Sequence, residues 1–149
     1  MKLLVALMLL CGPSEPKPFV AKGNTKRHFE LQVEELKVQL SDNNGVVWSN
    51  NSRAFQVLFA RDDSWVAMKG PDATGDIEIA PTTIDAAVFT VSPLEHLNEK
   101  EKSRVPKGNC GDAWFVDWAS SPKGLKLTVA QTEGAKVILY VSADGTVSR

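Results

Sequence analysis

The chain has 149 residues, a formal net charge of −1, and 43% hydrophobic and 23% charged residues. These values are ordinary for one soluble globular domain, and they exclude a chain that is disordered throughout. Because proteins that bind nucleic acid usually carry a basic excess, which this chain lacks, we expect no nucleic acid among its partners.

The N-terminal residues have the pattern of an export signal. Lys2 precedes an unbroken apolar run over residues 3–11, and a segment rich in proline and charge follows over 12–28. A charged start, a short apolar run and a polar break are typical of a secretory signal, whereas a membrane-spanning helix needs about 20 apolar residues. The sequence therefore predicts a signal-like segment over 1–11, a flexible Pro/Gly-rich tether over 12–28 and a single β-sandwich domain over 29–149.

The segment Met8–Gly12 resembles the lipobox of bacterial lipoproteins, in which the cysteine becomes the lipidated first residue of the mature chain. The resemblance implies lipid attachment at Cys11, export to the bacterial periplasm or cell envelope, and membrane attachment through the N-terminus. The residues alone leave open a second interpretation, in which the protein is cytosolic and the apolar run forms a buried strand.

The first part of the domain is expected to be a β-hairpin. Residues 29–40 alternate apolar and polar side chains, which predicts a half-buried strand. The alternation slips by one residue at 34–35, so this run is either one strand with a β-bulge or two strands. The Asn44-Gly45 pair is the strongest short signal for a hairpin, and it predicts a returning strand over 46–48.

The rest of the chain also predicts short strands separated by turns. The segment 137–141 is apolar on both faces, which predicts a strand covered on both sides. Asp144-Gly145 is a second hairpin signal. Regular turns every eight to twelve residues are typical of an antiparallel sandwich, so we expect an all-β, mostly antiparallel fold, a β-sandwich or partly open barrel of about eight short strands. The further strands are expected at 54–60, 65–68, 77–79, 86–91, 113–119, 125–131 and 136–142.

One short surface helix is predicted near 93–103. Ser92–Glu95 has the order of a capping serine, a proline at the first helical position and a glutamate at the third. The residues that follow are mostly charged, so we expect the helix to lie on the surface and to be anchored by Leu94 and Leu97.

Cys110 is the candidate nucleophile of the alternative, enzymatic hypothesis. Gly108–Ala113 resembles the cysteine loop of transglutaminase-like proteins, which implies a reactive thiolate and a cysteine-dependent hydrolase or acyl transferase. In that family a histidine follows the cysteine in the chain. Here both histidines, His28 and His96, precede it, so our leading hypothesis assigns no catalytic residue.

A metal site is not expected. The segment 72–78 places three carboxylates in a glycine-containing loop, and calcium binds oxygen ligands of this kind. Asp and Gly are also ordinary turn residues, and the two histidines do not have the spacing of a zinc site. We therefore predict a turn, with no metal and no cofactor.

The candidate binding residues lie on the predicted strand 113–119. Trp114 and Trp118 share one face of this strand, and Phe115 and Asp117 share the other. Inward tryptophans would belong to the core, which their apolar area favours, whereas outward tryptophans would form a platform for a sugar ring or a protein. We take Trp114, Trp118 and Asp117 as candidate ligand-binding residues of an exported or membrane-tethered binding or scaffold module that contacts protein or carbohydrate without catalysis.

Overall fold

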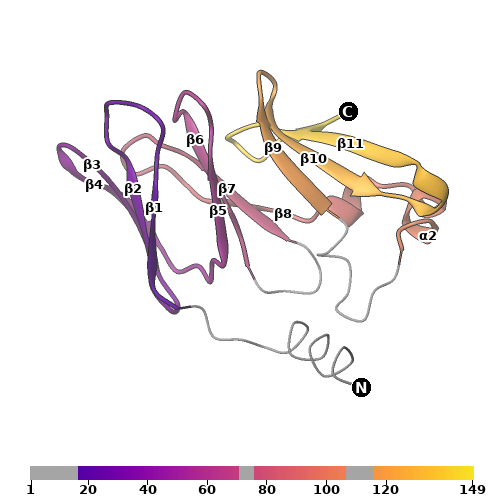
Figure 1. Cartoon of the computed structure of the whole chain (residues 1–149), viewed down its shortest axis with the longest axis horizontal. Helices are drawn as coiled ribbons and strands as arrows, with labels where there is room; N and C mark the ends of the chain where they lie inside the picture. Colours follow the sequence, from indigo (N-terminus) through magenta and orange to yellow (C-terminus); the bar gives the residue numbers. More distant parts are fainter. Residues whose placement is uncertain (1–16, 71–75, 107–115) are drawn as a thin grey trace.

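The protein is described by a computed structural model that covers residues 17–70, 76–106 and 116–149. These residues form twelve short strands in three four-stranded antiparallel sheets, which confirms the expected all-β, antiparallel class (Figure 1). No closed barrel is present in the described part of the chain, because each of the three sheets has two edge strands.

Sheet A is a meander of four consecutive strands. Residues 29–40 contribute two strands to it, since the backbone N–H of Glu34 donates to the carbonyl of Lys37 at 2.8 Å and closes a turn. The slip in the alternation at 34–35 is therefore a turn between strands, and the register shift of this sheet lies instead between Leu40 and Ser41. The strands are β1 (Phe19–Lys22), β2 (Glu30–Val33), β3 (Val38–Asp42) and β4 (Gly45–Asn50).

β1 lies inside the segment 12–28 that the sequence predicts as a tether, and here the prediction needs correction. Phe19 pairs with Val33, and Lys22 pairs with Glu30, so β1 is the edge strand of sheet A. Its inward residues Phe19 and Ala21 pack against the core. Four residues between a proline and a glycine are too short for their alternation to stand out in the sequence, and pairing with β2 is what orders them.

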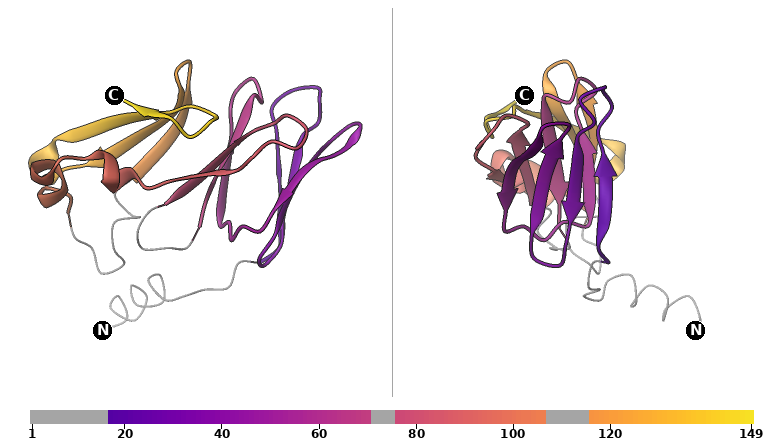
Figure 2. Two further views of the ribbon diagram at one scale, coloured as in Figure 1. Left: turned by 180° about the vertical axis from the view of Figure 1, so that it is seen from behind. Right: turned by 90° about the vertical axis from the view of Figure 1, so that its left-hand side faces the viewer.

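Sheets B and C complete a stack of three layers, with sheet B in the middle (Figures 1 and 2). The strands of sheet C run obliquely to those of the other two sheets (Figure 1). Sheet B contains β5 (Gln56–Phe59), β6 (Trp65–Lys69), β7 (Ile77–Pro81) and β8 (Phe89–Val91). Sheet C contains β9 (Val116–Ser121), β10 (Gly124–Ala130), β11 (Lys136–Val141) and β12 (Val147–Ser148), in the order β12-β11-β10-β9.

The middle sheet is apolar on both faces because each face packs in a different hydrophobic core. On β6, Val66 and Met68 belong to the core shared with sheet A, and Trp65 and Ala67 belong to the core shared with sheet C. All four side chains are buried. A strand that is covered on both sides reads as a continuous apolar run rather than an alternating one, which is the pattern of this segment.

The strand predicted to be covered on both sides, 137–141, is covered on one side only. Leu139 is 0% exposed, whereas its neighbour Ile138 is 40% exposed. The prediction is wrong because sheet C is an outer layer, and no described residue cluster packs on its second face. Strands β6 and β11 both have apolar residues on two faces, so the sequence alone does not show that only β6 is covered on both sides.

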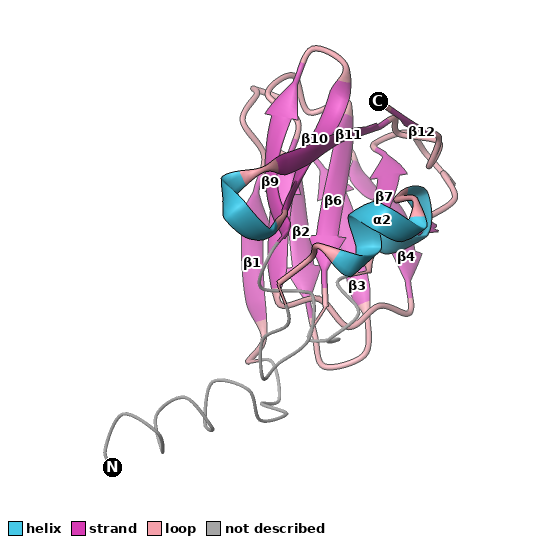
Figure 3. Ribbon diagram, turned by 90° about the vertical axis from the view of Figure 1, so that its right-hand side faces the viewer, coloured by secondary structure: helices cyan, strands magenta, loops and turns pink. Residues whose placement is uncertain are grey.

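The single helix predicted near 93–103 is replaced by two short elements, the 3-10 turn η1 (Pro93–His96) and the α-helix α2 (Glu99–Ser103). Leu97 separates them in an extended conformation, with φ −100° and ψ 146°, and its side chain is buried in the core between sheets B and C. Burial of this leucine interrupts the helix. A further 3-10 turn, η3 (Thr132–Gly134), joins β10 to β11, and Figure 3 shows α2 on the sheet C side of the stack.

The helix cap is formed by Asn98 rather than by Ser92. Asn98 Oδ1 accepts from the backbone N–H of Glu101 at 2.8 Å, and Glu101 Oε1 accepts from the backbone N–H of Asn98 at 2.9 Å. These two bonds form a capping box, while the Ser92 side chain makes no cap hydrogen bond. Hydrogen bonds from Arg149 and from Asn98 hold the pKa of Glu101 at about 2, so this carboxylate is ionised at neutral pH.

We expect Asn98→Ala to lower the free energy of unfolding by about 1 kcal/mol, the usual cost of losing an N-cap side chain. Ser92→Ala is the matched control and should change it by less than about 0.5 kcal/mol. Urea unfolding of the two variants measures both values. A larger effect of Ser92→Ala than of Asn98→Ala would contradict the position of the cap.

Candidate functional site

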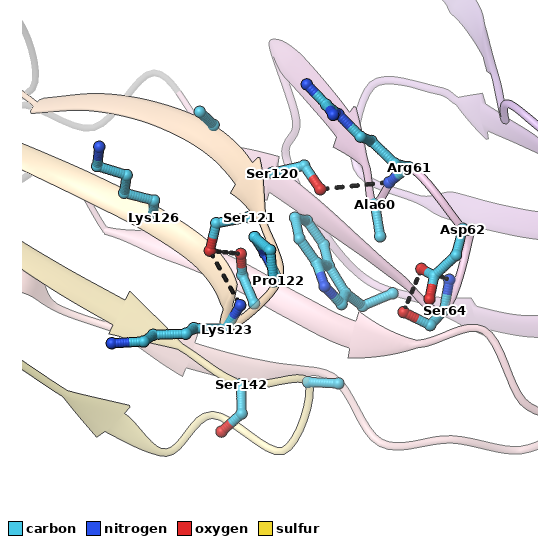
Figure 4. A pocket seen from close by; sticks show the side chains of 14 residues that line it. Ala60, Arg61, Asp62, Ser64, Ser120, Ser121, Pro122, Lys123, Lys126 and Ser142 are labelled. Atoms are coloured by element: carbon cyan, nitrogen blue, oxygen red, sulfur yellow. Dashed lines mark hydrogen bonds between the residues drawn. The ribbon is translucent and has the colours of Figure 1, made fainter.

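An open groove of about 710 Å³ lies between sheets B and C, where three loops meet (Figure 4). One wall is the β5–β6 loop, the other is the β9–β10 hairpin, and the β11–β12 loop adds Ser142 and Ala143. Ala60 and Trp65, which belong to the buried core, line its base. The site is therefore built from segments far apart in the sequence.

Backbone geometry holds the two walls close together. The backbone N–H of Arg61 donates to Ser120 Oγ at 3.2 Å, which bridges the walls directly (Figure 4). The β9–β10 hairpin turns tightly between the paired residues Ser121 and Gly124. Gly124 has φ +116°, and a Cβ there would overlap the backbone of Val141. Only glycine fits this turn without displacing β11.

Most hydroxyl groups of the groove already donate a hydrogen bond within the protein. Ser64 Oγ donates to Asp62 at 2.6 Å, and Ser121 Oγ donates to a carbonyl of its own hairpin at 2.9 Å. Ser142 Oγ lies 2.8 Å from an Asp144 carboxylate oxygen. The hydrogen bonds from Ser64 lower the pKa of Asp62, so this carboxylate is charged at neutral pH. These hydroxyl groups therefore already have hydrogen-bond partners within the protein, so contacts with a ligand would be made by other polar groups of the groove.

Three residues that line the groove are cationic, but Lys126 pairs with Tyr140 on the outer face of sheet C, opposite to the buried face that packs on sheet B. Arg61 extends from the β5–β6 loop, and Lys123 and Lys126 extend from sheet C (Figure 4). The ion pairs of the described residues lie elsewhere and involve none of these three cations. The Lys123 ammonium group lies 4.9 Å from the centroid of the Tyr140 ring, a cation–π contact that positions it.

The buried carboxylate of Asp63 anchors the β5–β6 loop to sheet A. It accepts hydrogen bonds from the backbone N–H groups of Asn24 and Thr25, both at 2.8 Å, and from Thr25 Oγ1 at 2.6 Å. Asp63 is 1% exposed and has φ 59°. A Cβ at Gly23 would lie 2.8 Å from its Oδ2 atom. This carboxylate therefore ties the β1–β2 loop of sheet A to the loop that lines the groove.

The candidate residues of β9 face opposite sides of sheet C. Trp118 pairs with Leu127, is half-buried and packs against the core between sheets B and C. Asp117 pairs with Thr128 and is exposed. The structure thus does not bring these two side chains to one surface. Trp114, Cys11 and Cys110 lie outside the described residues, as do positions 72–75 of the acidic loop.

The groove residues were not singled out from the sequence. The sequence predicts turns at 61–64 and at 120–124, and the backbone turns at both places. Because these positions are about sixty residues apart in the chain, no local motif joins them. Basic residues at the tips of predicted hairpins were the one signal that the sequence offered.

Two ionisable side chains of sheet B, on opposite faces of the sheet, have shifted pKa values. Burial raises the pKa of Glu78, and the hydrogen bond from Ser52 at 3.0 Å partly offsets this rise. Burial lowers the pKa of Lys69, against the attraction of Asp117. Within the described ranges, no three His, Cys, Asp or Glu side chains lie close enough to hold a metal ion, and both histidines are exposed.

Comparisons with known proteins give no relative. No family model, no curated protein and no solved structure matches the chain. Within the described residues, no helix has both the length and the apolar character to cross a membrane.

Proposed function

We propose that the protein is an exported or membrane-tethered binding module that contacts a protein partner through the groove between sheets B and C, without catalysis. The groove is the observation that supports this proposal. It is open, a hydrogen bond joins its two walls, and Arg61 on one wall has no acidic partner among the described residues. Export and tethering rest on the sequence of residues 1–28 alone.

A protein partner is favoured over a carbohydrate by the aromatic residues near the groove. Binding of a sugar ring usually needs an exposed aromatic face. Trp65 at the base is only 5% exposed, and Lys123 already covers the ring of Tyr140. The described residues of the groove therefore offer charge and backbone groups rather than a stacking surface.

Obstructing the groove tests this function. We expect wild-type protein, immobilised and incubated with an extract of its native source, to retain a partner that Ala119→Trp does not retain. Ala119 is exposed on the outward face of β9 and borders the groove, so a large ring there obstructs the rim of the site without entering the core. Ser49→Trp is the matched control, because Ser49 is exposed on sheet A, away from the groove.

The captured partner is identified by mass spectrometry, purified and titrated against the three proteins. Thermal melts establish that both tryptophan variants are folded. Equal retention of the partner by wild type, Ala119→Trp and Ser49→Trp would show that the groove is not the contact surface.

A further inference from the structure

We propose that Asn44 is a modification site, at which the side-chain carboxamide is lost as ammonia without the help of an enzyme and the residue becomes aspartate or isoaspartate. The site lies at the tip of the β3–β4 hairpin, in the only Asn-Gly pair of the chain (Figure 1). The inference is independent of the proposed function, because the hairpin belongs to sheet A and none of its residues lines the groove.

The reaction takes place between two neighbouring residues and consumes one water molecule. The backbone nitrogen of Gly45 loses its proton and attacks Cγ of Asn44, so that a bond from this nitrogen to Cγ forms and the bond from Cγ to Nδ2 breaks. The amide nitrogen leaves as ammonia and takes up the proton. Water then opens the cyclic succinimide at either of its carbonyl groups, which gives aspartate or isoaspartate. Asparagine is one of the thermally labile residues of proteins.

The structure leaves the attacking nitrogen of Gly45 accessible. Gly45 is exposed and has φ +120°, and a Cβ at this position would meet no other atom within 4 Å. Gly45 forms the last pair of the β3–β4 ladder with Asp42, and the ends of a ladder open more easily than its middle. Because glycine also has no side chain to hinder the approach, the nitrogen can reach Cγ of Asn44 without displacing another residue.

The carboxamide of Asn44 is not held in place by the protein. The backbone N–H of Asn44 donates to Asp42 Oδ1 at 2.8 Å, whereas its carboxamide forms no hydrogen bond with the residues that the structure describes. The carboxamide of Asn43 differs, because it donates to a backbone carbonyl of the β1–β2 loop at 3.2 Å. The carboxamide of Asn50 donates to a serine hydroxyl at 2.7 Å. Asn44 therefore combines a mobile side chain with a following glycine.

The other pair that could form a succinimide, Asp144-Gly145, is held on both sides. The Asp144 carboxylate accepts from the backbone N–H of Thr146 at 3.0 Å. A Cβ at Gly145 would lie 2.8 Å from Cβ of Phe89, so this glycine is packed against β8. The two turns have similar sequences, and tertiary packing leaves the one at Asn44 open to reaction.

Deamidation would change the tip of the hairpin without reaching the core. It adds one negative charge, and isoaspartate also adds a methylene group to the backbone that joins β3 to β4. The contacts nearest to the change are those of the β1–β2 loop, where Arg27 pairs with Asp42 at 3.6 Å and its carbonyl accepts from the backbone N–H of Asn43 at 3.2 Å. The next residue of β4, Val46, is 58% exposed, so we expect the modified chain to stay folded.

The test incubates the full chain at physiological temperature and follows the tryptic peptide 38–53 by mass spectrometry. We expect this peptide to gain the mass difference between a hydroxyl and an amino group, and fragmentation to place the change at Asn44. An isoaspartyl methyltransferase should label part of the product. Asn43, Asn50 and Asn51 lie in the same peptide and should react at least about tenfold more slowly, since none precedes a glycine. The rate should rise with pH, because the nitrogen attacks after losing its proton.

Two variants and a reference peptide complete the test. Asn44→Gln should abolish the mass gain, because the longer side chain would have to close a larger ring. Asn43→Gln is the matched control and should react at Asn44 within about twofold of wild type, as expected for a change at an exposed site. The synthetic peptide 38–53 gives the rate without the fold.

A folded protein that stays unmodified while the synthetic peptide reacts would overturn the inference, because it would show that the hairpin protects Asn44. A mass gain in Asn44→Gln equal to that of wild type would also overturn it, as would reaction at Asn50 or Asn51 as fast as at Asn44. Circular dichroism before and after the incubation establishes that the chain reacts in its folded state.

Discussion

Asp63→Ala should lower the free energy of unfolding by about 3 kcal/mol, because it leaves three partly buried donors without their acceptor. The carboxylate is the acceptor for two backbone N–H groups and one hydroxyl group of the β1–β2 loop. Each donor left unsatisfied costs about 1–3 kcal/mol, less where water can enter. Alanine also disfavours the left-handed backbone of this position, where φ is 59°. Urea unfolding measures the loss.

Two further variants separate the causes. Asp63→Asn retains a residue that tolerates the left-handed conformation, but its amide group replaces one acceptor by a donor, so we expect a loss of about 2 kcal/mol. Asp62→Ala, at the exposed neighbouring position, should lower the free energy of unfolding much less than either Asp63 variant. An Asp63→Asn variant as stable as wild type would show that the carboxylate does not hold the two sheets together.

Leu139→Ala should lower the free energy of unfolding by about 2–5 kcal/mol, the usual cost of deleting a core leucine side chain. Leu139 is 0% exposed and lies in the core that sheets B and C share. The methyl and methylene groups removed would leave a cavity between two layers that are held apart by their other side chains. The effect measures how tightly sheet C packs on the middle sheet.

Ile138→Ala, one residue earlier on the same strand, is the matched control. Ile138 is 40% exposed on the outer face of sheet C, so its truncation should lose about 1 kcal/mol or less. Both variants keep the strand in place and differ only in the face that is changed. A large loss from Ile138→Ala would indicate that the outer face of sheet C is covered, for example by a second copy of the chain, and a dependence on protein concentration would identify that case.

Local patterns predicted the strands because pairing in antiparallel sheets is mostly between neighbours in the chain. The alternation of Phe29, Leu31 and Val33 matches the buried face of sheet A, and the Asp144-Gly145 signal marks the loop before β12, where Gly145 has φ 84°. Such signals depend on only a few consecutive residues. Strand β1 has only four residues between a proline and a glycine, too few for its alternation to give such a signal.

The sequence by itself determined the all-β class, the antiparallel pairing and most of the hairpins, since these follow from side-chain alternation and turn chemistry. The tertiary structure decided which apolar strands lie in the middle layer, because β6 and β11 have similar composition and differ only in what packs on their second face. It also decided the candidate site. Arg61 and Ser120 meet across two sheets, and their proximity depends on how the layers stack, which no local stretch of residues encodes.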